Sequence, residues 1–383
     1  MAFHLKRRVL AAAAAFTLGA ASVAQATPLY SVTQISGPSQ WGTTAQAAVN
    51  NLGQVAWAYI PSSSTNLSDG VSYLFTPGVG NTSLGPAHFW ASDLNDGGLA
   101  VGAVYGSLSE SHAAALNTRT GQFTQLSSDV GYASMVNNRG DVVGSRYVPG
   151  DGPQFVSRAT LYRQDGTFVD LQGDLFSGKS TFVSGINDAG QILLSASFFG
   201  PFHNAVGTVD GGFTPLPEPT GVLGVAAGRG LAENGSFTGA IQTVDERGFI
   251  SYHAFIYQDG QYEMLPEQPG TEYSSGRALN DAGVVVGNWS DNSAFVYSRS
   301  TGAVPLTGLL SADCSISRVE DISDSGYIAA VGRCGGTGEG LLLLSPVTAP
   351  VPEPAQPMLL ALGLAALPVA LRRRPSLARR TSS

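Results

Sequence analysis

Apolar and polar residues alternate along this chain in short runs that return at regular intervals. The clearest run, residues 279–289, reads Leu-Asn-Asp-Ala-Gly-Val-Val-Val-Gly-Asn-Trp. Asn and Asp side chains bond their own backbone in turns, and Gly takes a positive φ without steric cost. The β-branched residues that follow favour a strand. The pattern therefore predicts a tight β-hairpin.

This hairpin occurs seven times, at intervals of 42 to 50 residues between turn glycines, which are Gly53, Gly98, Gly140, Gly190, Gly235, Gly283 and Gly326. A second hairpin follows each time, and its clearest copy is residues 253–265 around Asp259-Gly260. Counterparts are residues 71–84, 113–126, 158–171, 204–216 and 293–306. Two hairpins in about 45 residues make four antiparallel strands, the content of one β-propeller blade.

The sequence therefore predicts an all-β protein whose residues 27–346 form a seven-bladed β-propeller of four-stranded antiparallel blades. The seventh repeat ends after a third strand, residues 340–345, while residues 29–35 form a spare strand before the first repeat. Pairing the two would close the ring and remove a sheet edge. An open solenoid with polar caps is the alternative. A ring of six or eight blades results if one repeat is miscounted, and the repeat around Gly235 matches least well.

The first 26 residues have the three parts of an export signal. Lys6, Arg7 and Arg8 precede an apolar, Ala-rich run, and Ala24-Gln25-Ala26 follows it. This order predicts a signal peptide, residues 1–26, that is cleaved between Ala26 and Thr27. An uncleaved anchor helix is the alternative, and the apolar run is short for it.

The C-terminal stretch is built like a sorting signal. Residues 347–357 are a Pro-rich linker that contains Val351, Pro352, Glu353 and Pro354. Residues 358–383 hold an apolar run of 14 residues, then Arg372, Arg373 and Arg374. Such a run is short for a bilayer span, and arginines beyond it stay inside. We expect a C-terminal apolar transmembrane helix with a basic tail; a permanent anchor is the alternative.

This C-terminal stretch resembles the PEP-CTERM sorting domain of Gram-negative bacteria. The resemblance implies processing by an exosortase, transient anchoring in the inner membrane through the C-terminal helix, and final placement at the cell surface or outside the cell. It also implies an association with exopolysaccharide. The repeats resemble the extracellular HAF family in His253-Ala254-Phe255 and in the hairpins at residues 186–190 and 279–287. That resemblance implies export and carries no catalytic residues.

The charge of the central region narrows the choice of partners. Setting the two end segments aside leaves 12 Lys and Arg against 27 Asp and Glu. A surface this acidic repels phosphate backbones, so we expect no nucleic-acid partner. Its charge suits solubility outside the cell, or cations.

The two cysteines, Cys314 and Cys334, flank the turn at residues 323–326 at equal distances. A hairpin folded there sets them opposite each other, and export favours oxidation. We expect a Cys314–Cys334 disulfide that holds the last repeat together. Two cysteines with no nearby His do not suggest a metal site.

Other candidate chemistry has a simpler structural interpretation. His112, His203 and His253 fall at equivalent points of three repeats, which is typical of polar residues at strand ends. The acidic turns supply one carboxylate per repeat, whereas Ca²⁺ needs six to eight oxygens from a dense loop; these residues are Asp96, Asp188, Asp281 and Asp324. Nucleophile-elbow, zinc-protease and phosphate-loop motifs do not occur. We therefore expect no catalytic, metal-binding or cofactor-binding residues.

These observations predict an exported, non-catalytic β-propeller that binds or scaffolds at the cell surface or in the extracellular matrix, with extracellular polysaccharide as a partner. One alternative is a carbohydrate-active enzyme, a glycoside hydrolase or lyase, which requires two carboxylates about 5–9.5 Å apart in one pocket. The other alternative is a purely structural repeat protein.

Overall fold

The computed structural model describes residues 29–347, apart from 37–45, 62–63, 65–66, 108–109, 151–154, 172, 174, 198–201, 245–247, 312 and 337. The predicted signal peptide with its Ala26–Thr27 cleavage site lies outside the described residues. So do the Val351–Pro354 motif, the C-terminal helix and the arginines 372–374. Within the described part, no helix is long and apolar enough to cross a membrane.

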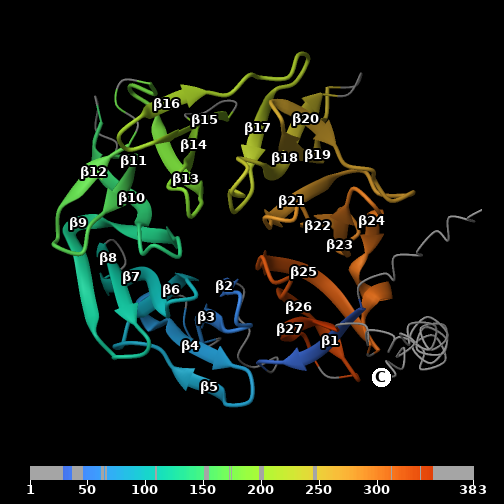
Figure 1. Cartoon of the computed structure of the whole chain (residues 1–383), viewed down its shortest axis with the longest axis horizontal. Helices are drawn as coiled ribbons and strands as arrows, with labels where there is room; N and C mark the ends of the chain where they lie inside the picture. Colours follow the sequence, from blue (N-terminus) through green and yellow to red (C-terminus); the bar gives the residue numbers. More distant parts are fainter. Residues whose placement is uncertain are drawn as a thin grey trace, which may run out of the picture.

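The described residues form strands arranged in a ring (Figure 1), with two short 3₁₀ helices, Leu67–Asp69 and Leu306–Leu309 (η2). The strands are β1 (Leu29–Gln34), β2 (Gln46–Val49), β3 (Val55–Tyr59), β4 (Val71–Thr76), β5 (Gly80–Ser83), β6 (Phe89–Leu94), β7 (Leu99–Ser107), β8 (Glu110–Asn117), β9 (Phe123–Val136), β10 (Val142–Pro149), β11 (Phe155–Tyr162), β12 (Phe168–Asp170), β13 (Ser180–Ile186) and β14 (Ile192–Ser197). They continue with β15 (His203–Thr208), β16 (Gly212–Pro215), β17 (Gly224–Ala227), β18 (Phe237–Val244), β19 (Ile250–Gln258), β20 (Gln261–Met264), β21 (Ser274–Leu279), β22 (Val285–Trp289), β23 (Ala294–Ser298), β24 (Gly302–Pro305), β25 (Cys314–Ile322), β26 (Ile328–Cys334) and β27 (Gly340–Val347).

The sheets confirm an all-β propeller and correct its predicted division into seven four-stranded blades. Five sheets have four antiparallel strands, and the sixth has seven, in the order β12-β11-β10-β9-β8-β7-β6. The cause is β9. Its first residues pair with β8, and its last residues, from Gly131 to Val136, pair with β10. One continuous strand thus ends one repeat and begins the next, so the two repeats share a single sheet.

The hairpin at residues 279–289 forms as the sequence predicts. The N–H of Gly283 donates to the carbonyl of Asn280 at 2.9 Å, and Gly283 has a φ of 73°. The N–H of Val284 donates to the side-chain oxygen of Asn280 at 3.0 Å. Asn therefore bonds its own turn, and Gly supplies the left-handed residue that ends a three-residue hairpin loop.

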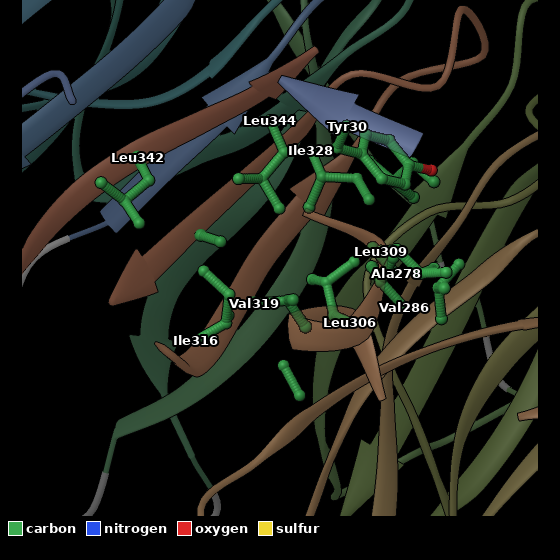
Figure 2. Close-up of a cluster of buried hydrophobic side chains, with 14 residues drawn as sticks. Tyr30, Ala278, Val286, Leu306, Leu309, Ile316, Val319, Ile328, Leu342 and Leu344 are labelled. Carbon is green, nitrogen blue, oxygen red and sulfur yellow. The ribbon is translucent and has the colours of Figure 1, made fainter. Parts of the chain in front are cut away.

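The spare N-terminal strand closes the ring, as predicted. β1 pairs antiparallel with β27, with Val32 opposite Leu344. Tyr30 is buried, and its carbonyl accepts a hydrogen bond from the N–H of Ser311 at 2.9 Å. Figure 2 shows Tyr30 beside Ile328 and Leu344, in an apolar cluster that β1, η2 and the last two sheets share. Burying this apolar surface stabilises the closed ring against opening at its termini.

Candidate functional site

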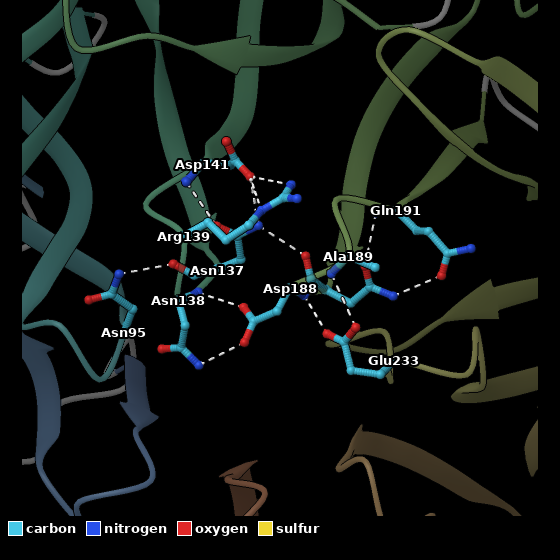
Figure 3. A network of polar contacts seen from close by, with 10 residues as sticks. Asn95, Asn137, Asn138, Arg139, Asp141, Asp188, Ala189, Gln191 and Glu233 are labelled. Carbon is cyan, nitrogen blue, oxygen red and sulfur yellow. Dashed lines mark hydrogen bonds and ion pairs between the residues drawn. The ribbon is translucent and has the colours of Figure 1, made fainter.

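One end of the ring is formed by the seven predicted turns, whose second residues are linked to one another. In six of the seven links, a side-chain oxygen accepts from the backbone N–H of the second residue of the preceding turn; in the link that closes the ring, the donor is the third turn residue, Ser325. Asp96 accepts from Asn51 at 2.8 Å, Asn138 from Asp96 at 2.9 Å, and Asp281 from Glu233 at 2.8 Å. Asp188 and Glu233 continue the series (Figure 3), Asp324 accepts from Asp281, and Asn51 accepts from Ser325. We call these side chains the turn ring: Asn51, Asp96, Asn138, Asp188, Glu233, Asp281 and Asp324.

A second series of hydrogen bonds lies beneath the turn ring and joins the first residues of the turns. The side-chain amide of Asn95 donates to the carbonyl of Asn137 at 2.9 Å, and that of Asn137 donates to Asn187 at 3.0 Å (Figure 3). The side-chain amide of Asn187 likewise donates to the carbonyl of Ala232. Ala232 has no side-chain amide, so the series is interrupted there. The turn residues that the sequence explains by local geometry therefore also connect neighbouring repeats.

The turn ring surrounds a cavity of about 160 Å³ at the centre of the molecule. Burial raises the pKa of Asp281, and repulsion from Asp324, Glu233 and Asp188 raises it further. The carboxylates are held apart by their backbone partners, and in the described part of the chain no three His, Cys, Asp or Glu side chains gather to hold a metal ion.

Arg229 lies deeper in the ring, inside this cavity's wall. Its guanidinium is 3.0 Å from the carboxylate of Asp93 and donates to the carbonyls of Ser92 at 2.8 Å and Ser134 at 3.4 Å. Burial lowers the pKa of Arg229, but the charges of Asp93 and Asp321 outweigh it and leave the pKa raised. Burial raises the pKa of Asp321 to about 6, against the attraction of Arg229. Charged residues from several repeats thus meet in the wall of the central cavity.

The opposite end holds a larger cavity, of about 810 Å³, that the sequence analysis did not predict. Aromatic side chains form its walls, and Gln46, Glu110 and Ser111 are among its polar residues. We call it the aromatic pocket; its rings are Trp90, Tyr105, Tyr132, Tyr147 and Phe155. Ser92 and Ser134 also line it, so Arg229 lies between the two cavities. An apolar cavity of this size with a few polar groups is typical of ligand sites.

The seven-stranded sheet positions these rings. Trp90 and Tyr132 stand on β6 and β9, five residues before the turn residues Asn95 and Asn137. A Cβ on Gly144 would lie 2.0 Å from the carbonyl oxygen of Tyr132, and one on Gly102 would lie 1.8 Å from that of Trp90. Both glycines are therefore required for the second strand of each repeat to approach the aromatic-bearing strand.

Local contacts hold the aromatic pocket in shape. The indole N–H of Trp90 donates to the side chain of Gln46 at 3.1 Å, which ties β6 to β2. The ring centroids of Tyr132 and Tyr147 are 6.3 Å apart. Burial raises the pKa of Tyr105 and of Tyr147, and proximity to Tyr132 raises both further. These phenols therefore stay neutral near pH 7 and present aromatic surface with a protonated hydroxyl.

A signal for this pocket was present in the sequence. Repeats two and three carry an aromatic residue five positions before the first turn residue and another ten positions after it, namely Trp90 with Tyr105 and Tyr132 with Tyr147. The other five repeats do not carry both. A search for differences between repeats would have singled out these positions, whereas a search for shared motifs passes over them.

The predicted disulfide is confirmed. Cys314 at the start of β25 lies opposite Cys334 at the end of β26, and the two are joined. The histidines at equivalent strand positions have polar partners: His112 contacts the carbonyl of Asp129 at 3.1 Å, His203 contacts Glu218, and His253 contacts Glu267. They stand on three different sheets, and each has its own separate partner.

No protein-family model and no curated protein sequence matches this chain. Its fold is similar to that of a puromycin hydrolase S511A mutant complexed with PGG (TM-score 0.55, 15% identity, 83% of this chain and 55% of that one). It is also similar to an acylaminoacyl peptidase from Pyrococcus horikoshii (TM-score 0.54, 10% identity, 81% and 53%). A third similar structure is the β-propeller domain of the Trilobed protease from Pyrococcus furiosus (TM-score 0.51, 11% identity, 82% and 98%).

The chain spans about half the length of the first two proteins, and at these identities the likeness is one of fold. The comparison corrects the function predicted from sequence. The similar structures come from a hydrolase, a peptidase and a protease rather than from matrix scaffolds, carbohydrate-active enzymes or structural repeat proteins. The expectation that this chain is not an enzyme is not confirmed.

Proposed function

We propose that this chain is a peptidase-type propeller that binds peptides, and that the aromatic pocket receives an apolar or aromatic side chain of the bound peptide. The observation that carries the proposal is this pocket of about 810 Å³. Aromatic rings prefer offset or edge-to-face contact with one another, and a flexible peptide side chain can adopt either. The fold likeness to peptidase propellers supports peptides as the ligand class.

The charges around the aromatic pocket indicate which peptides fit best. Glu110 stands at the exposed edge of the pocket and would attract a cationic residue or the amino terminus of a peptide. At the inner end, the guanidinium of Arg229 is bound by two carbonyls and by Asp93, so it closes the path towards the turn ring. A peptide therefore enters and leaves through the aromatic end.

The test uses two dye-labelled heptapeptides that differ only at the central residue, Phe or Ala, and that carry Arg at both ends. Fluorescence anisotropy with the purified chain should show at least tenfold tighter binding of the Phe peptide. Mass spectrometry of the same mixtures shows whether the bound heptapeptide is also cleaved. Equal affinity for the two peptides, or binding to neither, contradicts the proposal.

We also propose that the protein is exported and processed at both ends. Support comes from the signal-peptide pattern that ends at Ala26, from the Val351–Pro354 motif and from the arginines at 372–374. A disulfide between Cys314 and Cys334 suits an oxidising compartment. Mass spectrometry of the protein recovered outside the inner membrane should show an N-terminus at Thr27; an intact N-terminus there contradicts cleavage.

A further inference from the structure

Three side chains on and next to the sheet β17–β20 form a continuous hydrogen-bonded series that the proposed function does not use. The hydroxyl of Thr243 on β18 lies 3.1 Å from Nε2 of His253 on β19. Nδ1 of the same imidazole lies 2.6 Å from the carboxylate of Glu267, in the segment after β20. All three side chains are half-buried, so they are held in place and still face solvent.

The partners of His253 determine which nitrogen carries the proton. A carboxylate can only accept, so Nδ1 of His253 is the nitrogen that donates its proton to Glu267. In the neutral ring, Nε2 then has a free lone pair and accepts from the hydroxyl of Thr243. This is the arrangement of a nucleophile, a general base and a carboxylate that orients the base.

The carboxylate is itself held in place. The hydroxyl of Ser274, a fully buried residue, donates to Glu267 at 3.2 Å and accepts from the backbone N–H of Ala254 at 2.9 Å. Ala254 directly follows His253, so the orienting carboxylate is tied to the strand that carries the base. This second set of contacts fixes the direction of the imidazole.

Thr243 stands where its strand projects beyond its neighbour. The pairing of β18 with β17 ends at Gln242, so Thr243 and Val244 extend past the neighbouring strand. Exposed apolar side chains also stand on this extension and on the facing part of β19, but Val244, Ile250 and Tyr252 lie on the opposite face of the sheet from Thr243, because side chains alternate along a strand. The backbone N–H that follows the nucleophile, that of Val244, belongs to the same extension.

We propose that Thr243, His253 and Glu267 form an acyl-transfer site for esters or amides. The oxygen of Thr243 attacks the carbonyl carbon while Nε2 of His253 takes its proton, and the N–H of Val244 stabilises the oxyanion. The carbon–oxygen or carbon–nitrogen bond to the leaving group then breaks as His253 returns the proton to it. Water, deprotonated by His253, releases the acid from Thr243.

The other two histidines at equivalent strand positions lack the nucleophile. His253 lies opposite Ile241, and Thr243 stands two residues further along β18. The same step from the partner of His112, Val104, reaches Gly106, and the sequence has Phe, not a hydroxyl residue, two positions after Ala196, the partner of His203. His203 keeps a carboxylate partner in Glu218 and therefore provides a matched histidine–carboxylate pair without a hydroxyl.

The test measures hydrolysis of p-nitrophenyl butyrate by the full purified chain, and peptide mapping after treatment with a fluorophosphonate probe. We expect a phosphonyl adduct on Thr243 and a rate that falls at least 100-fold in Thr243→Val and in His253→Gln. Thr243→Ser should keep or raise the rate because its hydroxyl is less hindered. His203→Gln is the control and should leave the rate unchanged.

An adduct on another residue, or ester hydrolysis that Thr243→Val leaves intact, overturns this assignment. The isosteric Thr243→Val and the active Thr243→Ser together separate loss of the nucleophile from loss of the fold. The inference extends the proposed peptidase-type function but uses a different site. Peptide binding that persists in Thr243→Val therefore supports the aromatic pocket even if the acyl-transfer site fails.

Discussion

The two ends of the ring are built on opposite principles. The turn ring uses one motif seven times, and every copy bonds the next, so that its carboxylates and amides already have backbone partners. The aromatic pocket is made once, where β9 joins two repeats in a single sheet, and its rings meet an open cavity. The difference teaches that repeated polar residues in this protein hold repeats together, whereas residues that break the repeat form a site.

Replacing a buried amide of the turn end should have the largest effect on stability. Asn137 is buried, donates to Asp141 and to the carbonyl of Asn187, and accepts from the N–H of Asp141. Asn137→Ala leaves buried polar groups without partners and should lower the free energy of unfolding by about 3 kcal/mol. Urea denaturation measures this, and peptide binding of the folded variant should be unchanged.

Asn138→Ala is the matched control because Asn138 belongs to the same turn but is exposed. Its loss should cost less than about 1 kcal/mol, since water replaces the lost contacts. Similar losses in the two variants would contradict the assignment of the buried amides as the main connection between repeats.

The buried charges between the two ends should make stability depend on pH. The pKa of Asp321 in the folded protein is about 6, above its ordinary value of 3.8. The folded protein therefore holds this proton more tightly than the unfolded chain. The contribution of Asp321 to stability is greatest below pH 4 and declines as the pH rises through 6, by up to about 3 kcal/mol. Denaturation midpoints between pH 4 and 7 should show a decline that Asp321→Asn reduces; an equal decline in both proteins refutes the role of Asp321.

Removing a ring from the aromatic pocket should weaken binding without unfolding the protein. Tyr147 is 40% exposed, so Tyr147→Ala should change the free energy of unfolding little. Its loss should weaken binding of the Phe heptapeptide about tenfold, or about 1.4 kcal/mol, and leave the Ala heptapeptide unaffected. If Tyr147→Ala lowers stability as much as Asn137→Ala and leaves peptide affinity unchanged, Tyr147 supports the fold rather than binding, and the assigned difference between the two ends is wrong.

The smallest effect is expected at the edge of the aromatic pocket. Glu110 is exposed, so its attraction for a cationic peptide is screened by salt. Glu110→Gln should weaken binding of the Arg-flanked peptide about two- to threefold at low salt, and the difference should vanish at high salt. A salt-independent loss would show that Glu110 acts through shape rather than charge.

The local sequence determined much of this fold. Asn-Asp-x-Gly corners and Asp-Gly corners set the hairpins, because Gly alone adopts the left-handed conformation freely and Asn bonds its own turn. The spare strand at residues 29–35 identified the closure by β1, since an unpaired edge and an unpaired strand complete each other. The symmetric placement of Cys314 and Cys334 about their turn identified the disulfide.

Only the tertiary structure decided how the repeats join and where a ligand fits. Hairpin signals report contacts within a few residues, so they could not show that β9 runs through two repeats and merges them into one sheet. The aromatic pocket, the Arg229 cluster and the Thr243–His253–Glu267 series each join residues from different strands. The sequence by itself determined the hairpins of each repeat, because turn chemistry depends on neighbouring residues. The sites depend on distances between residues of different strands, which only the packed ring defines.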